Sequence, residues 1–115
     1  MAYDERLAER ARKALNRPEL GCEDGLIEKK MFGGLAFLIN GNMACGVVRD
    51  EMMIRVGPEH HEEALAQPYA RPMDFTGRPL KGFVYVEREG TQTDDALEGW
   101  IGRGVSFARS LPAKR

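Results

Sequence analysis

The pair Asn40-Gly41 stands between two apolar segments, and it restricts the possible folds of this chain more than any other feature of the sequence. Both residues tolerate the positive φ angles that the type I′ turn of a tight β-hairpin requires. Their position predicts a two-residue turn between a strand at 35–39 and a strand at 42–48. We therefore expect an antiparallel sheet at the centre of the fold.

The two strands of this hairpin are apolar on both faces. A register without a bulge places Phe37 opposite Ala44 and Leu38 opposite Met43, and these two pairs lie on opposite faces. A sheet with one face in water alternates polar and apolar residues instead. We therefore expect helices of the chain to cover one face and a second copy of the chain to cover the other, in a homodimer. The candidate contacts with a second copy or another protein are Phe37, Leu38, Met43 and Trp100.

The flanking segments predict helices at both ends of the chain and further strands between them. Apolar residues recur every three or four positions over 3–17, with acidic residues early and basic residues late, as the helix dipole favours. Thr93 is placed to cap a last helix that contains Trp100. Alternation and turn residues predict the remaining elements, which are strands at 26–32, 52–56 and 81–87, a short helix at 59–67, and an extended piece near 73–75.

Length, composition and charge limit the classes of function. The 115 residues fit one domain, spanning 1–115, and 43% of them are hydrophobic. The net charge of −1 gives no overall field that would attract nucleic acid, so direct nucleic-acid binding is not expected. No apolar run approaches the ~20 residues that cross a bilayer, so no membrane association is expected. Cys22 and Cys45 lack the spacing of a metal or disulfide motif, and the N-terminus has no apolar leader, so we expect a cytoplasmic protein.

The two predicted terminal helices each have a feature with more than one interpretation. Five basic residues of the first helix interleave with acidic ones, which is typical of a solvated face but also permits a nucleic-acid patch; they are Arg6, Arg10, Arg12, Lys13 and Arg17. The last helix contains Gly99, Gly102 and Gly104, each of which weakens it by about 1 kcal/mol relative to alanine. These glycines indicate either close packing on the sheet or on a partner, or a locally weak helix.

The doublet Gly33-Gly34 is a candidate ligand-binding loop. A bulge or sharp bend at the start of the strand is one interpretation, and close backbone approach to a ligand is the other, although the spacing of a P-loop or a dinucleotide fingerprint is absent. Arg55 is the charged residue of an otherwise apolar strand, where it either pairs with a carboxylate or contacts an anion, or extends from the sheet edge into water. The candidate binding residues are Met31, Phe32, Gly33, Gly34 and Arg55.

The sequence contains no pattern typical of a catalytic or metal site. His60 and His61 are adjacent, so on a helix their side chains diverge by about 100° and cannot readily share one metal ion. We expect both histidines to be exposed. Cys45 falls in the middle of an apolar strand, where a thiol is usually an inert filler of the core. Neither a metal nor a cofactor is expected, and we assign no catalytic residue.

Four segments of the chain together resemble the TfoX N-terminal domain family, which occurs in TfoX/Sxy bacterial competence regulators and in stand-alone small proteins. The segments are KKMFGGLAFLINGNMACGV from Lys29, MMIRVG from Met52, MDFTGRPLKGFVYV from Met73 and LEGWIGRGVSFARSLP from Leu97. The resemblance implies a two-layer α+β fold with N-terminal and C-terminal helices on an antiparallel sheet of about five strands, in the order α-β-β-β-β-α-β-α. It implies no catalytic residues, and the elements predicted above agree with this fold.

Two hypotheses of function from different classes follow. The first is a non-enzymatic protein-interaction module that forms a homodimer and, as the resemblance implies, contacts a protein partner in transcriptional regulation. The doubly apolar hairpin and the glycine-containing last helix support it. The second is a small-molecule or metal-binding protein or enzyme with a site near Gly33-Gly34, which requires a pocket with convergent polar groups there. We favour the first.

Overall fold

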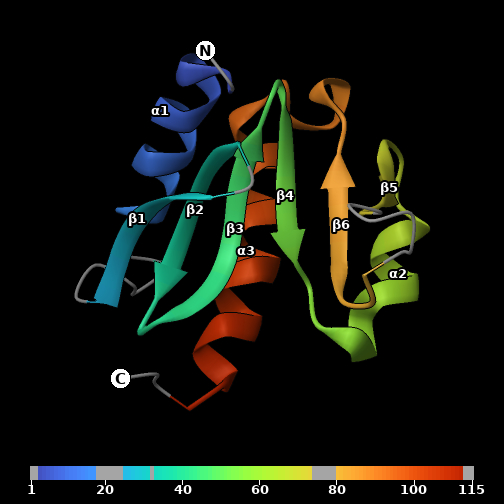
Figure 1. The fold of residues 1–115 in the computed structure, drawn as a ribbon. Coiled ribbons are helices and arrows are strands. Elements are labelled where there is room, and N and C mark those ends of the chain that lie inside the picture. Colours follow the sequence, from blue (N-terminus) through green and yellow to red (C-terminus); the bar gives the residue numbers. More distant parts are fainter. Residues whose placement is uncertain (1–2, 18–24, 32, 74–79, 113–115) are drawn as a thin grey trace.

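Helices at both ends of the chain flank a run of strands in the computed structural model, which describes residues 3–17, 25–31, 33–73 and 80–112 (Figure 1). The strands are β1 (Leu26–Met31), β2 (Gly34–Ile39), β3 (Asn42–Val48), β4 (Glu51–Arg55), β5 (Ala70–Pro72) and β6 (Phe83–Val86). The helices are α1 (Glu5–Leu15), α2 (His61–Leu65) and α3 (Asp94–Ser110), with short 3₁₀ turns at η3 (Pro58–His60) and η4 (Arg88–Thr91).

The strands form one antiparallel sheet in the order β1-β2-β3-β4-β6-β5. Helices α1 and α3 lie behind this sheet in Figure 1, where α3 packs against β3 and β4, and α2 packs beside β5 and β6. The two-layer α+β fold is therefore confirmed. The sheet has six strands rather than about five, because β5 forms at 70–72, just before the extended piece that the sequence predicted near 73–75. Residues 74 and 75 lie outside the described part of the chain.

The predicted hairpin turn forms at Asn40-Gly41. The φ angles of these two residues are 53° and 85°, which are the positive values that a type I′ turn requires. The turn joins β2 to β3, and it sets Ile39 directly opposite Asn42. The positive φ angles of these two residues therefore determine how β2 and β3 pair next to the turn.

The register of the hairpin departs from the prediction after one further pair. Leu38 lies opposite Met43 as expected, but Phe37 lies opposite Cys45 rather than opposite Ala44. Ala44 is thus an extra residue in β3, a β-bulge that shifts every later pair by one position. The prediction of an unbulged register was wrong from Phe37 onwards.

The bulge lies where α3 packs closely against the sheet. A Cβ atom built on Gly104 of α3 would lie closer than 3.0 Å to the carbonyl oxygen of Ala44. The helix therefore packs against backbone at the bulge, and only glycine leaves room for this contact. Cβ atoms at Gly99 and Gly102 would meet no atom within 4 Å, so close packing explains one of the three helix glycines.

Both terminal helices begin at a residue whose side chain satisfies free backbone N–H groups. The carboxylate of Asp4 accepts hydrogen bonds from the backbone nitrogens of Arg6 and Leu7, at 2.9 and 3.1 Å. The hydroxyl of Thr93 accepts one from the backbone nitrogen of Ala96 at 3.1 Å, so the predicted cap of α3 is confirmed.

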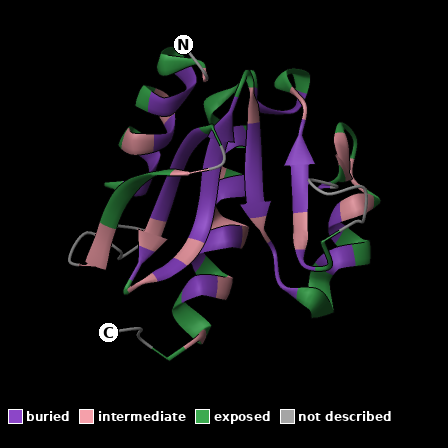
Figure 2. Cartoon of the chain, in the orientation of Figure 1, coloured by how far each residue is buried: buried purple, intermediate pink, exposed green. Residues whose placement is uncertain are grey.

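The two faces of the sheet have different surroundings, and we call them the helix face and the outer face. On the helix face, Phe37, Cys45, Ile54 and Val84 form one line across four strands and are all buried, with α3 packed over them (Figure 2). The outer face has a smaller buried cluster, which consists of Val48, Met53, Met73 and Tyr85. The chain therefore covers part of its own outer face.

Candidate functional site

The glycine doublet forms a turn between two strands. Met31 at the end of β1 lies opposite Gly34 at the start of β2, so two residues connect these strands, and the second of them, Gly33, has a φ angle of 72°. A Cβ atom on Gly34 would lie closer than 3.0 Å to the carbonyl oxygen of Val47. Turn conformation and close strand packing therefore account for both glycines. Phe32, another candidate, lies outside the described residues.

Arg55 lies far from this doublet. Gly34 is at the end of the sheet where β4 begins, whereas Arg55 is the last residue of β4. The Arg55 guanidinium carbon lies 5.5 Å from the centre of the Phe83 ring and 5.1 Å from the centre of the Phe107 ring. The cation thus contacts aromatic rings at the opposite end of the sheet. The structure does not bring the candidate binding residues together.

The candidate contact residues divide between the two faces of the molecule. Phe37 and Trp100 are buried in the core between the sheet and α3. Leu38 and Met43 are half-buried neighbours on the outer face, and Ile27 of β1 lies opposite Leu38 on its other side. These three residues, Ile27, Leu38 and Met43, form a continuous line that we call the apolar row. Ile27 is 59% exposed, the most of any large hydrophobic residue in the described chain.

The apolar row ends at β1, which is the edge of the sheet. This strand pairs with β2 alone in the described part of the chain, and Figure 1 shows no strand on its outer side. Its residues Glu28, Lys29 and Lys30 are exposed. An edge strand carries unpaired backbone N–H and C=O groups that another strand can bind. The row and the edge together form a surface that offers both apolar contact and backbone hydrogen bonds.

One ion pair holds the helix side of β1 to α1. The Arg12 guanidinium donates to both carboxylate oxygens of Glu28, at 2.5 and 2.8 Å. These hydrogen bonds are the main cause that lowers the pKa of Glu28 below its ordinary value of 4.5, against the opposing effect of burial. The same contact raises the pKa of Arg12. The pair fixes the position of the Glu28 carboxylate beside the free edge.

Two further arginines also form ion pairs, and they are Arg10 of α1 and Arg17, which follows the end of that helix. Arg10 lies 3.2 Å from the carboxylate of Asp94, and Arg17 lies 2.7 Å from that of Glu98. These contacts join α1 and the residues after it to α3, and they neutralise part of the basic character of this region. They agree with a solvated, mixed-charge face on this helix.

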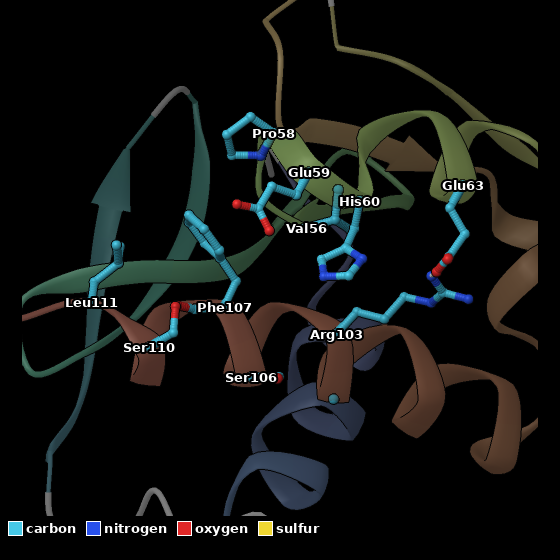
Figure 3. A pocket seen from close by; sticks show the side chains of 11 residues that line it. Val56, Pro58, Glu59, His60, Glu63, Arg103, Ser106, Phe107, Ser110 and Leu111 are labelled. Carbon is cyan, nitrogen blue, oxygen red and sulfur yellow. The ribbon is translucent and has the colours of Figure 1, made fainter.

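A groove of about 890 Å³ lies between the η3–α2 segment and the C-terminal half of α3 (Figure 3). Its apolar wall contains Val56, Pro58, Phe107 and Leu111. The ring of Phe107 packs directly on Gly57, where a Cβ atom would lie closer than 3.0 Å to it. His60 lines this groove, and so does Phe107, which lies four residues after Arg103 on the same side of α3. No sequence pattern identified Phe107.

The polar rim of the groove is largely neutralised by its own residues. Arg103 lies 3.3 Å from the carboxylate of Glu63, and its guanidinium carbon lies 5.1 Å from the centre of the Trp100 ring. His60 is exposed, and Figure 3 shows its imidazole pointing toward α3. The groove therefore presents an apolar floor beside a paired cation, which suits an apolar ligand or side chain more than a free anion.

The two histidines have different environments. His60 is exposed as expected, but His61 is buried, and its Nδ1 atom accepts a hydrogen bond of 2.8 Å from the backbone nitrogen of Gly82. The prediction that both are exposed was wrong for His61, because the residue before β6 packs against α2 and its backbone N–H donates to the imidazole. Among the described residues, no three His, Cys, Asp or Glu side chains gather where they could hold a metal ion.

A family model described as the TfoX N-terminal domain matches residues 20–108. No curated protein and no solved structure matches the chain. Within the described residues, no helix has both the length and the apolar character needed to cross a membrane. The family match covers about three quarters of the chain and includes all six strands of the sheet, the turn at Gly33-Gly34 and most of α3. The chain therefore belongs to the TfoX N-terminal domain family.

Proposed function

We propose that this chain is a non-enzymatic protein-interaction module that forms a homodimer and acts in transcriptional regulation. The observation that carries the proposal is the apolar row of Ile27, Leu38 and Met43 beside the free edge of β1. A large exposed apolar residue that continues into a half-buried line is typical of a protein contact surface. The role in regulation rests on the family alone.

The apolar row lies apart from the main core of the domain. Its residues lie on the outer face, away from α1 and α3, whereas the core of the domain lies on the helix face. Leu38 is at the centre of the row, between the other two residues. Burial of these side chains against another molecule removes apolar surface from water, which favours association.

The experiment compares the wild type with Leu38→Asp by sedimentation velocity at several protein concentrations. We expect a dimer for the wild type and a folded monomer for the variant, with dimerisation weakened about tenfold or more, because a carboxylate beside Ile27 opposes the burial of the apolar row against another molecule. Far-ultraviolet circular dichroism checks that the variant is folded. A monomeric wild type, or a variant that remains dimeric, contradicts the proposal.

Tyr69→Asp provides a matched control. Tyr69 is 50% exposed but lies outside the row, just before β5, and aspartate tolerates its φ angle of 68°. This variant adds the same charge to a different exposed apolar position, so we expect it to remain a dimer. If both variants were monomeric, a general effect of charge on association would explain the result, and the assignment to the row would be wrong.

The second candidate function is the binding of a small apolar molecule, and the groove beside α3 favours it. This site differs in place from the Gly33-Gly34 turn, which lies at the β1–β2 end of the sheet. Native mass spectrometry of the purified protein tests this candidate, because a retained ligand adds its own mass. A retained mass that disappears in Phe107→Ala supports the groove as the site, whereas a bare polypeptide mass for the wild type counts against this second candidate.

A further inference from the structure

The two edge strands of the sheet differ in their capacity to bind another strand. β5 has three residues and ends at Pro72, which lacks a backbone N–H. β1 has six residues, none of them proline, and pairs with β2 alone within the described chain. Short edge strands and prolines prevent further pairing. β1 is therefore the edge at which the sheet can be extended.

We propose that two copies of this chain join through β1, in an antiparallel pair with Lys29 of each copy opposite Lys29 of the other. This inference rests on the proposed homodimer and specifies its geometry. The two sheets then form one continuous sheet, with β1 and its copy at the centre. The occupant of the free edge is thus a second copy of the chain.

Symmetry restricts the registers that such a pair can adopt. A two-fold axis perpendicular to the sheet relates the two strands and keeps every residue on its own face. Residues directly opposite each other must then be an even number of positions apart in the sequence. The two centred registers place either Glu28 or Lys29 opposite its own copy.

The sequence of β1 favours the register centred on Lys29. Glu28 then lies opposite the partner's Lys30, and Ile27 lies opposite the partner's Met31, and symmetry repeats each contact once. Opposite charges and apolar residues in directly opposed positions stabilise an antiparallel pair. The register centred on Glu28 instead opposes two carboxylates and places Ile27 opposite a lysine, and like charges in this arrangement are destabilising.

The same register completes both faces of the extended sheet. Glu28 lies on the helix face, where Arg12 holds its carboxylate, and Lys30 lies on that face as well, opposite Leu35. Ile27 and Met31 lie on the outer face with Leu38. The exposed end of the apolar row is thereby covered by the partner's Met31. The two Lys29 side chains are long and exposed, so their ammonium groups can diverge into water.

Disulfide cross-linking tests the register directly. In a Cys22→Ser background, Lys29→Cys places two thiols at directly opposed positions, about 4.5 to 5.5 Å apart between Cα atoms, which is within the range of a disulfide. We expect mild oxidation to convert most of this variant to a covalent dimer, read on a non-reducing gel. Cys45 is buried. The Cys22→Ser chain without the new cysteine measures how much cross-linking Cys45 alone produces.

Lys30→Cys in the same background is the control. Its two thiols are displaced by two positions in the proposed register, at roughly 8 Å between Cα atoms, beyond the reach of a disulfide. We expect several-fold less cross-linking than for Lys29→Cys. Equal or greater cross-linking at position 30 overturns the register.

A charge reversal gives a second measurement that needs no new cysteine. Lys30→Glu opposes two pairs of carboxylates across the interface, and we expect it to weaken dimerisation about tenfold. Lys13→Glu makes the same change at an exposed position on α1 and should leave dimerisation unchanged. A Lys30→Glu variant that dimerises as tightly as the Lys13→Glu variant contradicts the inferred contact.

Sedimentation of the wild type separates this inference from the proposed function. If the wild type is a monomer, the homodimer itself is wrong, and the register is wrong with it. If the wild type is a dimer that Leu38→Asp disrupts, but Lys29→Cys does not cross-link, the interaction module stands and the β1 geometry is overturned.

Discussion

Phe37 and Leu38 are consecutive residues of β2, yet they belong to surfaces with different roles. Phe37 faces the helices and is fully buried among side chains of its own chain. Leu38 faces the other way, is half-buried, and joins Ile27 and Met43 in the apolar row. The hairpin is apolar on both faces, but only one face is closed throughout by the fold. The comparison indicates that the helix face determines stability and the outer face is available for association.

On the helix face, a helix packs directly against the backbone of the sheet. At the bulge, the carbonyl group of Ala44 meets α3 at Gly104, and no side chain lies between them. On the outer face, the side chains of Ile27 and Leu38 reach toward solvent. A methyl group added at Gly104 should therefore destabilise the chain, whereas a small change at Ile27 or Leu38 should be tolerated.

The largest expected effect comes from truncating the two neighbours on β2. Phe37→Ala removes a buried ring and should lower the free energy of unfolding by about 3 to 5 kcal/mol. Leu38→Ala removes a half-buried side chain and should lower it by about 1 kcal/mol. Urea denaturation at low protein concentration measures both, because association then contributes little. Similar losses for the two variants would show that the faces do not differ in the way described.

The sequence contains the information for this hairpin but not for its bulge. Asn40-Gly41 identifies the turn because only a few residue types tolerate its positive φ angles. Ala44 has no chemical property that marks a bulge, and the bulge lies against α3, which is far from it in the sequence. Local patterns therefore predict the elements, whereas the register involves contacts between distant parts of the chain.

The candidate sites show the same limit. The sequence marked Gly33-Gly34 as a candidate site, and in the structure these glycines belong to a turn. Ile27, which lies among the charged residues of β1, was not a candidate, although it is highly exposed. The exposure of Ile27 depends on which strand forms the sheet edge, and periodicity alone does not give strand order. His61 was missed because a five-residue helix is too short for a reliable pattern of burial.

Alanine substitutions along α3 sharpen the comparison at a smaller scale. Gly104→Ala gains helix propensity but forces α3 away from the Ala44 carbonyl, and we expect a net loss of about 2 kcal/mol in the free energy of unfolding. Gly99→Ala meets open space and should raise that free energy by up to ~1 kcal/mol. Thermal unfolding of both variants measures the contrast. A neutral Gly104→Ala would mean that the helix does not press against the bulge.

The smallest expected effect concerns the exposed margin of the helix face, where Arg12 of α1 binds Glu28 of β1. Both side chains are about one third exposed, so Arg12→Gln should lower the free energy of unfolding at pH 7 by no more than about 1 kcal/mol. The pKa of Glu28 is lowered by folding, so the ion pair stabilises the folded chain above the unfolded pKa of Glu28 and loses this effect as pH falls through the lowered value. The difference between wild type and variant should therefore shrink as the pH falls below 4.5 and vanish at more acidic pH. Lys13→Gln is the control, because it removes the same charge from the neighbouring exposed position and should show no such pH dependence. If the difference between Arg12→Gln and the wild type stayed constant down to acidic pH, the effect would come from packing rather than from the ion pair.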